Sequence, residues 1–324
     1  MAAPSRDQQR ASGATSPVVA LRGVTKHYGE QRAVDGVDLE VPPGICFGLL
    51  GPNGAGKTTT LRMTYGVTPP TSGSVEVFGI DVTRRPRAVR RRLGVTLQEN
   101  ALIEELTPAE NLRVFGRYHL ARPAEINARI EHLLDFLELR SHAHLRVAEL
   151  SGGFQRRLAI ALSLMNDPEL LILDEPTTGL DPAVRLSLWT RVRELRSEGA
   201  TVLLTTHYMD EAERLCDRLA VMDRGRVVAE GAPAELIRKH LAPDVLEIDV
   251  PAARQGALLA ELGDPIHLQV GARLVIYADD AAVLLERVRH LDGGLGGEAH
   301  PILRRTNLED VFLRITGTRL EEGA

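Results

Sequence analysis

The stretch that decides the fold is Gly51-Pro52-Asn53-Gly54-Ala55-Gly56-Lys57-Thr58, which directly follows the apolar run 45–50. An apolar run, a glycine-rich turn and Lys-Thr, in this order, predict a buried strand, a phosphate-binding loop and the start of a helix. The glycines let successive backbone N–H groups face one anion, and the helix N-terminus adds the positive end of its dipole. We therefore expect Lys57 to meet the β and γ phosphates of a nucleotide and Thr58 to offer its hydroxyl to Mg²⁺, with Thr59 in the same turn. A chance glycine-rich turn is the alternative, and the order of strand, loop and helix argues against it.

Short apolar runs recur further along the chain, at 94–97, 170–173 and 201–205. Nearly continuous apolar runs of this length are typical of parallel strands buried on both faces. Helical stretches separate them, so we predict an α/β core, a mixed and mostly parallel sheet with helices. Residues 18–41 instead alternate short apolar stretches with turns, which predicts antiparallel strands at the edge of a sheet.

The run 170–173 ends in two carboxylates, Asp174 and Glu175. In an open α/β sheet, ligands bind at the carboxyl ends of the strands. We expect Asp174 to hold the magnesium shell and Glu175 to orient and deprotonate a water against the γ phosphate. A strand ending in solvated acids is the alternative, and the phosphate-binding loop earlier in the chain argues against it.

A second glycine-rich turn, Leu150-Ser151-Gly152-Gly153-Phe154-Gln155, precedes a predicted helix over 154–165. Ser151 is a favourable N-cap, so the simplest interpretation is a cap and a flexible turn. Ser-Gly-Gly at a helix start is also a second anion site. Two phosphate sites for one nucleotide per chain are explained by a head-to-tail dimer, in which each Ser151 turn covers the nucleotide on its partner's loop.

The remaining pattern predicts three domains. Residues 1–17 are rich in Ser, Ala, Gln and Arg and are predicted to be a disordered tail; 18–240 form a nucleotide-binding domain with a helical subdomain at about 100–165; and 241–324 form a small α+β accessory domain. Within these domains we expect a helix over 126–139, a closing hairpin around Arg224-Gly225, strands at 245–250 and 273–278, a helix over 281–291 and a glycine-rich loop at 293–297.

Composition excludes several classes of protein. The 324 residues carry a net charge of -5, which gives no electrostatic footprint for nucleic acid. The two cysteines, Cys46 and Cys216, lie among apolar neighbours and are predicted to be reduced core residues. No apolar run approaches the ~20 residues that span a bilayer, and the chain start has no hydrophobic segment typical of a secretory signal.

From about residue 18 to residue 231 the sequence resembles the ATP-binding cassette family, with its signatures in order. The resemblance implies that Tyr28 stacks on adenine, that Gln98 senses magnesium and the interface, and that His207 is the switch histidine. Ser151-Gly152-Gly153 correspond to the family signature and Gly179-Leu180-Asp181 to its aspartate loop. The pattern departs from the common signature at Phe154, but Ser-Gly-Gly is intact, so activity is expected. Without the resemblance, Tyr28, Gln98 and His207 would be an edge aromatic, a loop amide and a structural histidine.

Two stretches, 98–112 and 307–313, resemble the exporters that include daunorubicin-resistance and nodulation-factor pumps. This implies an ATPase subunit of an exporter, with antibiotic resistance among the possible roles. ATP and Mg²⁺ are the expected cofactors, and a homodimer closing around two Mg·ATP is expected to push on a separate membrane permease. We expect peripheral attachment at the cytoplasmic face of the cell membrane, through protein contacts around 98–106, with Leu102, Ile103 and Leu106 cradling a short helix.

Three other functions are disfavoured by the sequence. A cassette ATPase of DNA repair or chromosome structure needs a long coiled-coil insertion between the loop and the signature, and the sequence has none. A translation-acting cassette protein resembles two fused cassettes, whereas this chain has one phosphate-binding loop. A non-enzymatic binding module is disfavoured because Lys57, Asp174, Glu175 and His207 are all present.

Overall fold

The computed structural model describes residues 16–119, 122–291 and 301–317. Most of the predicted N-terminal tail and the glycine-rich loop at 293–297 lie outside these residues. The chain divides into two compact units, Met1–Glu230 and Gly231–Ala324. Composition predicts a boundary near residue 241 instead; helix α8 (Pro233–His240) lies between the two positions and packs against α11 (Leu308–Thr316) of the second unit.

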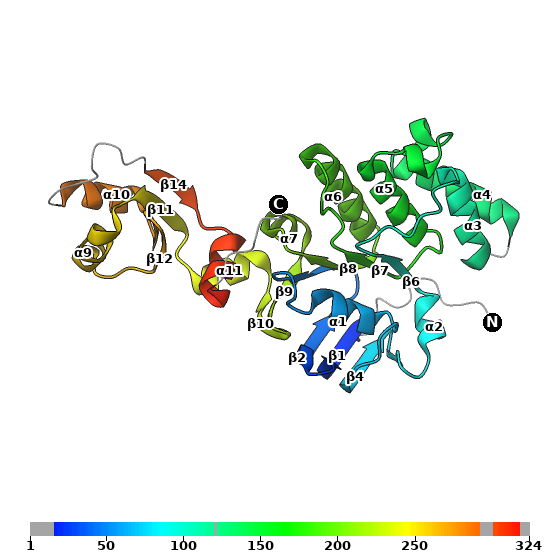
Figure 1. Ribbon diagram of the computed structural model, residues 1–324, viewed down its shortest axis with the longest axis horizontal. Coiled ribbons are helices and arrows are strands. Elements are labelled where there is room, and N and C mark those ends of the chain that lie inside the picture. The colour runs from blue at the N-terminus through cyan, green and yellow to red at the C-terminus, as the bar shows by residue number, and fades with distance from the viewer. Residues whose placement is uncertain (1–15, 120–121, 292–300, 318–324) are drawn as a thin grey trace. The chain divides into compact units, whose positions relative to one another are not determined.

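The first unit is built on a six-stranded sheet with strand order β10-β9-β3-β8-β7-β6 (Figure 1). Its strands are β3 (Cys46–Leu50), β6 (Leu93–Thr96), β7 (Leu170–Asp174), β8 (Thr201–Thr206), β9 (Arg218–Asp223) and β10 (Arg226–Gly231). The pairs β3–β8, β3–β9, β6–β7 and β7–β8 are parallel, which confirms the predicted α/β core. The β9–β10 turn has Arg224 at φ 47° and Gly225 at φ 80°, the left-handed pair that a tight hairpin requires.

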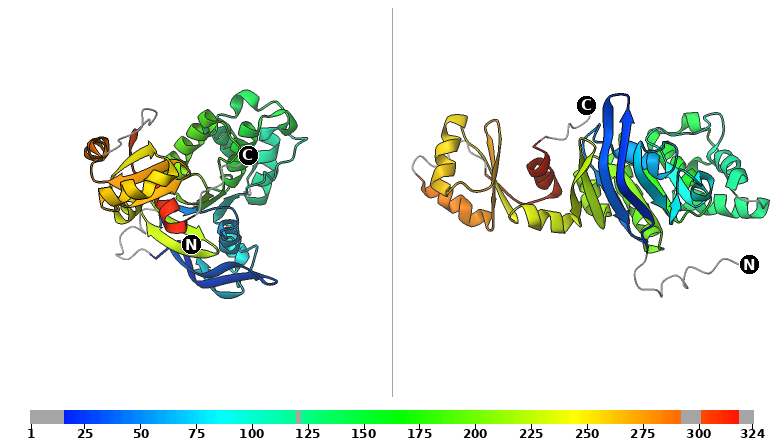
Figure 2. Two further views of the ribbon diagram at one scale, coloured as in Figure 1. Left: turned by 60° about the vertical axis from the view of Figure 1, so that its left-hand side comes forward. Right: turned by 90° about the horizontal axis from the view of Figure 1, so that it is seen from below.

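A second sheet of the first unit has the order β2-β1-β4-β5. Its strands are β1 (Val19–Tyr28), β2 (Gln31–Val41), β4 (Ser72–Val77) and β5 (Ile80–Asp81), and their pairings are antiparallel as predicted. In Figure 2 its longest strands form a layer beside the six-stranded sheet. The two layers share one core, in which Val19, Val37 and Val75 meet Phe47, Leu49 and Ile172. This core fixes β3 and β7, whose carboxyl ends carry the predicted site.

Helices cover the rest of the first unit. They are α1 (Lys57–Thr64), α2 (Pro86–Arg90), α3 (Pro108–His119), α4 (Pro123–Phe136), α5 (Gly152–Ser163), α6 (Pro182–Ser197) and α7 (Met209–Leu215). The helices α3, α4 and α5 occupy the stretch in which the apolar pattern turns helical, and short turns at Arg140–His142 and Val147–Glu149 connect α4 to α5. Helix α4 ends before the predicted residue 139 because Glu138 adopts a left-handed φ of 56°.

The second unit has one antiparallel sheet, with the order β12-β13-β11-β14. It contains β11 (Asp244–Asp249), α9 (Ala252–Leu262), β12 (His267–Val270), β13 (Arg273–Ala278), α10 (Ala281–His290) and β14 (Ile302–Arg305) besides α8 and α11. Leu246, Ile248 and Ile276 form its core with Leu259 of α9 and Leu284 of α10. Among all the described residues, no helix is both long and apolar enough to cross a membrane.

Candidate functional site

The glycine-rich loop lies between β3 and α1 and has the backbone that a phosphate requires. Gly54 and Gly56 have φ angles of 80° and 100°, a region that favours glycine. A Cβ on Gly56 would lie 2.5 Å from the Ala33 carbonyl oxygen, and one on Gly51 would lie 2.3 Å from that of Met222. Helix α1 has no acidic residue in its first turn, so its positive N-terminal end faces the loop without competition.

Lys57 is almost fully buried at the start of α1, with 4% of its surface exposed. Its Nζ donates to the carbonyl oxygens of Gly51 (2.7 Å) and Pro52 (3.1 Å) and lies 3.6 Å from Glu175 Oε1. Burial lowers the pKa of Lys57, and the charge of Glu175 opposes this shift. A buried cation that mainly contacts neutral carbonyls is prepared for further negative charge.

Asp174 ends β7 beside the loop. Its Oδ1 accepts hydrogen bonds from the hydroxyls of Thr58 (3.1 Å) and Thr205 (2.6 Å), and Thr205 in turn accepts one from the Glu175 backbone N–H (3.0 Å). Thr205 was not among the site residues predicted from the sequence. Its position at the polar end of a buried strand, two residues before His207, was the available signal.

Glu175 is the centre of the site and is 6% exposed. Its Oε2 lies 3.4 Å from Gln98 Nε2, 3.3 Å from His207 Nδ1 and 3.2 Å from the Thr178 hydroxyl. The His207 imidazole and then the Lys57 ammonium hold the pKa of Glu175 below its usual value, against the effect of burial. Glu175 also has a left-handed φ of 45°, a strain of about 1–3 kcal/mol that is typical of functional sites.

The structure thus brings Lys57, Thr58, Asp174, Gln98, Glu175 and His207 into one contact network. Among the described residues, Tyr28, Ser151 and Asp181 share no hydrogen bond or ion pair with it. Tyr28 is 47% exposed beside Lys26 at the end of β1. Asp181 occupies the N-cap position of α6, without a capping bond from its side chain.

The Ser151 turn begins α5 at Gly152, two residues earlier than predicted. Ser151 occupies the N-cap position, but its hydroxyl makes no capping hydrogen bond. The expected side-chain cap is therefore absent here, and Ser151 and Gly152 are both exposed. The space around Gly153 is smaller, because a Cβ there would lie 3.2 Å from a Val184 methyl carbon.

Two buried charged residues near the site were not predicted. Arg156 of α5 is 5% exposed and donates to backbone carbonyls at the ends of β6 and β7. Glu211 of α7 is fully buried, and its Oε1 accepts from the Thr177 hydroxyl (2.8 Å) and from Trp189 Nε1 (2.9 Å). Burial raises the pKa of Glu211. Because the polar residues Gln155 and Arg157 flank Arg156, the local sequence pattern did not indicate that Arg156 is buried.

The oxygen atoms of the site suit Mg²⁺. Thr58 and Asp174 present one hydroxyl and one carboxylate that already lie 3.1 Å apart. Mg²⁺ is usually held by one or two carboxylates together with substrate phosphates rather than by an all-protein cage. Consistent with this, the described residues contain no group of three or more His, Cys, Asp or Glu that could hold a metal alone.

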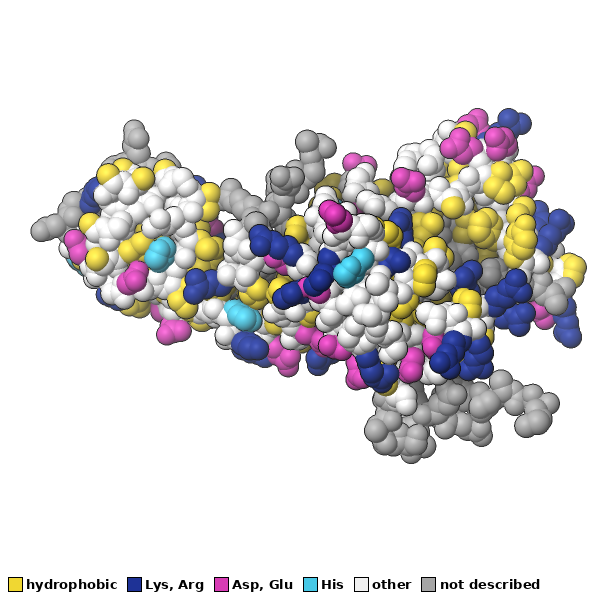
Figure 3. Space-filling view, turned by 60° about the horizontal axis from the view of Figure 1, so that its bottom comes forward, with side chains coloured by type: hydrophobic (Ala, Val, Ile, Leu, Met, Phe, Trp, Pro, Cys, Tyr) yellow, Lys and Arg dark blue, Asp and Glu magenta, His cyan; other side chains and the backbone are white. Residues whose placement is uncertain are grey.

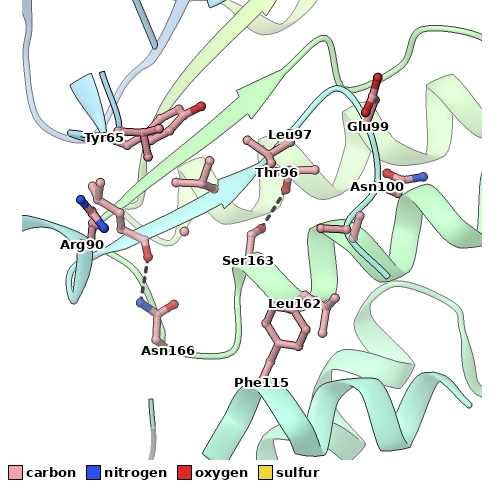
Figure 4. Close-up of a pocket in the computed structure, with 16 residues that line it drawn as sticks. Tyr65, Arg90, Thr96, Leu97, Glu99, Asn100, Phe115, Leu162, Ser163 and Asn166 are labelled. Atoms are coloured by element: carbon pink, nitrogen blue, oxygen red, sulfur yellow. Dashed lines mark hydrogen bonds between the residues drawn. The ribbon is translucent and has the colours of Figure 1, made fainter. Parts of the chain in front are cut away.

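A separate cavity of about 360 Å³ lies next to Gln98 in the first unit (Figure 4). Its lining comes from β6 and the residues that follow it, from α3 and α5, and from Tyr65 and Val67 after α1. Figure 4 shows the rings of Tyr65 and Phe115 pointing into it from different sides, with Arg90 and Glu99 at its edges. The cavity is mainly apolar with two opposite charges on its rim.

Comparisons with known proteins place the chain among transporter ATPases. Residues 34–178 match the family described as ABC transporter, and residues 256–317 match the C-terminal domain of the nodulation factor export protein NodI. A Nod factor export ATP-binding protein I of Ralstonia nicotianae is 46% identical, over 95% of this chain and 96% of that protein. One from Rhizobium meliloti is 47% identical, over 99% of this chain and 94% of that protein.

Solved structures agree for the first part of the chain. An ATP-binding subunit of an ABC transporter is 31% identical, with a TM-score of 0.63, covering 68% of this chain and 92% of that one. A dimeric ATP-binding cassette in a post-hydrolysis state, bound to ADP and Pi, is 29% identical, with a TM-score of 0.61, covering 66% of this chain and 98% of that one.

Proposed function

The chain belongs to the ATP-binding cassette transporter family as an ATP-hydrolysing subunit, and from this premise we propose that it powers export by closing as a homodimer around two Mg·ATP. The observation that carries the proposal is the contact network at the carboxyl ends of β3 and β7. There a buried lysine, a carboxylate paired with a hydroxyl, and a second carboxylate near a histidine converge. A dimeric relative with bound ADP and Pi supports the closed form.

In this proposal each residue of the network has one task. Lys57 turns its ammonium from the loop carbonyls toward the β and γ phosphates, and the backbone N–H groups of 54–59 hold the phosphate oxygens. Glu175 stays deprotonated because its pKa is lowered, and it accepts the proton of the attacking water. Gln98 and His207, both beside Glu175 Oε2, hold that water and the γ phosphate in line. Tyr28 stacks on the adenine.

Thr58, Asp174 and Gln98 are the residues that would hold Mg²⁺. When bound, the ion neutralises phosphate charge during the transfer. Thr205 keeps the Asp174 carboxylate in place beside Thr58 through its 2.6 Å hydrogen bond.

The homodimer rests on the Ser151 turn. Its exposed hydroxyl and N–H groups, with the start of α5, form an anion site that the chain's own network does not contact. In a head-to-tail pair, Ser151, Gly152 and Gly153 cover the nucleotide of the partner subunit and Asp181 lies at the shared interface. Dimer formation with ATP is measured by size-exclusion chromatography of Glu175→Gln protein. A protein that binds nucleotide yet stays monomeric contradicts this arrangement.

We assign the cavity of Figure 4 as the docking site for a separate membrane permease. An apolar floor with a charged rim is the usual anatomy of a protein interface. The side chains of Val67 and Leu97 are 61% and 41% exposed in its lining. Figure 3 shows hydrophobic side chains of the first unit flanked by arginine and lysine. Of the expected stretch 98–106, residues 99–101 line the cavity, whereas Gln98 and the three predicted contact residues Leu102, Ile103 and Leu106 lie outside its lining.

This docking predicts a peripheral position at the cytoplasmic face of the membrane. The test is fractionation of cells with and without the neighbouring membrane gene. We expect the protein in the membrane fraction only when the permease is present, and Leu97→Glu should release it while ATP hydrolysis of the purified protein persists. Continued membrane binding in the absence of every candidate permease contradicts the assignment.

For the cargo we propose a Nod factor or a molecule of similar build. The support is the name shared by the relatives, together with similarity along nearly the whole chain, including the C-terminal domain. The test is deletion of the gene in its native host, followed by analysis of the secreted molecules. Unchanged secretion of Nod factors would argue for another cargo.

A further inference from the structure

Arg156 makes the densest set of hydrogen bonds in the buried part of the first unit. All three guanidinium nitrogens donate. Nη1 bonds the carbonyls of Leu97 (2.5 Å) and Gln98 (3.3 Å) and the side chain of Asn100 (3.1 Å). Nε and Nη2 bond the carbonyls of Pro176 (2.8 Å), Asp174 (2.8 Å) and Glu175 (3.0 Å).

These acceptors are unusual for a buried arginine. Buried arginines are normally paired with a carboxylate, whereas five of the six acceptors here are backbone carbonyls and the sixth is an amide. Burial accordingly lowers the pKa of Arg156 to about 10. A planar fork bonded to carbonyls fixes the course of a backbone rather than balancing a charge. The backbone that it fixes carries Gln98 and Glu175.

The position of Arg156 on α5 links it to the other predicted site. It follows Ser151 by five residues, which places it about 7.5 Å further along the helix axis. The N-terminal end of α5 is free to contact a ligand. About one and a half turns further along the same helix, Arg156 hydrogen-bonds both segments that carry Gln98 and Glu175. Any displacement of α5 therefore moves these two side chains.

We propose that Arg156 is a positioning residue that couples the two ATP sites of the dimer. The inference rests on the proposed function, in which the Ser151 turn binds the partner's nucleotide. Binding of that nucleotide fixes the position of α5. Through its hydrogen bonds, Arg156 then fixes the positions of Gln98 and of the left-handed backbone of Glu175. Each site then becomes competent only when the other is filled, which is a coupling between two distinct sites.

The test is Arg156→Lys, which keeps the charge but loses the planar fork. A misplacement of about 1 Å in a catalytic group costs on the order of 10²-fold in rate. We expect kcat to fall by about that factor while the KM for ATP changes little, because Arg156 bonds only the backbone carbonyls of Gln98, Asp174 and Glu175 and leaves their side chains free for the nucleotide. We also expect the Hill coefficient for ATP to fall toward one, the value for independent sites.

The matched control is Arg129→Lys. Arg129 is less buried than Arg156 but is likewise bonded to a backbone carbonyl at α5, at its far end: Nε and Nη2 donate to Leu164 O at 3.2 and 2.7 Å, and Nη2 lies 3.5 Å from Asp167. It should leave the Hill coefficient unchanged. If Arg129→Lys lowers cooperativity as much as Arg156→Lys, both arginines merely support the helix and the proposal fails.

Asn100→Ala gives a second variant that does not disturb the core. Asn100 is exposed and loses only its single bond to Arg156. We expect a smaller loss of cooperativity in the same direction. If wild-type protein neither hydrolyses ATP nor dimerises as Glu175→Gln, the proposed function fails; if wild type is cooperative and Arg156→Lys remains so, only the coupling role fails.

Discussion

The two units of this chain surround a cation in opposite ways: Lys57 is buried, whereas Arg304 is partly exposed. In the first unit, Lys57 donates to two neutral carbonyls and has one carboxylate, Glu175, at 3.6 Å, and burial lowers its pKa. In the second unit, Arg304 is held by Asp310 at 2.7 and 2.8 Å and by Glu247 at 2.6 Å, and the bonds to Asp310 raise its pKa. The negative charge around Lys57 does not offset the cost of burying it, whereas the two carboxylates around Arg304 stabilise its charge.

This difference distinguishes a ligand-binding site, in the first unit, from a structural network, in the second unit. The Asp310 carboxylate also accepts a hydrogen bond from the Tyr277 hydroxyl. The polar groups around α11 of the second unit are therefore hydrogen-bonded to one another. Such a network needs no ligand. In the first unit, burial leaves Lys57 suited to an added anion, and Glu175 keeps the strained backbone that is typical of functional sites. Perturbed groups of this kind therefore locate the chemistry in the first unit.

The largest expected effect is at Glu175. Glu175→Gln keeps the size and hydrogen bonding of the side chain but cannot take a proton, so hydrolysis should fall by about 10²- to 10⁴-fold. ATP binding should persist, and the protein should accumulate as an ATP-bound dimer. Release of phosphate and size-exclusion chromatography measure the two results. Adding Ser151→Arg should abolish the dimer, because the side chain fills the partner's phosphate site.

Lys57→Ala removes the buried cation of the first unit. Loss of one preorganised electrostatic group typically costs about 10²- to 10³-fold in rate, and nucleotide binding should weaken as well. Phosphate release and titration with a fluorescent ATP analogue are the measurements. Full ATPase activity of Lys57→Ala protein would refute the phosphate-binding role of this loop.

Much of this architecture was predictable from local pattern. Strands β3, β6, β7 and β8 were predicted to within one residue at either end, because buried parallel strands are continuous apolar runs. The short strands β12 and β14 were missed, since each has four residues and includes exposed polar side chains that a surface turn would also have.

The site was predictable only in part. The loop and the two acids could be found because each follows a buried strand in the sequence. The contacts of Arg156 could not, since they depend on β6 and β7 ending side by side, with Thr96 opposite Leu173. Pairing of segments 77 residues apart is set by tertiary structure. Gln98, His207 and Tyr28 depended on family resemblance for the same reason.

The pH dependence of activity and stability should distinguish Lys57 from Arg304. A lysine with a folded pKa below its ordinary value of 10.5 loses its charge earlier as pH rises. We therefore expect kcat/KM, which reports the free enzyme, to decline on the alkaline side before pH 10.5, by up to about tenfold per pH unit. Folding stability should rise with Lys57 deprotonation over that window, because the folded state binds fewer protons there. Arg304 should stay charged throughout, so a matching loss in the second unit's structure would contradict the assignment.

The smallest expected effect on ATP binding comes from removing the second unit. Truncation at about residue 241 deletes the sheet of β11 to β14, which has its own core and polar network. ATP affinity should remain close to that of the full chain, while dimer stability or regulation changes. Isothermal titration calorimetry measures the first quantity and analytical ultracentrifugation the second. Loss of ATP binding in a truncated protein that is still folded would show that the predicted boundary is wrong.

Arg304→Met provides the matched point control within the full chain. It leaves Asp310 buried without its main partner, which typically costs about 3–5 kcal/mol, and the lower end applies because Arg304 keeps 30% of its side chain exposed. Thermal unfolding should therefore show an earlier transition for the second unit, while the ATPase rate changes little. If Arg304→Met instead lowered ATP affinity as much as Lys57→Ala does, then the two networks would act as one, and the separation of site from scaffold drawn from their opposite pKa shifts would not hold.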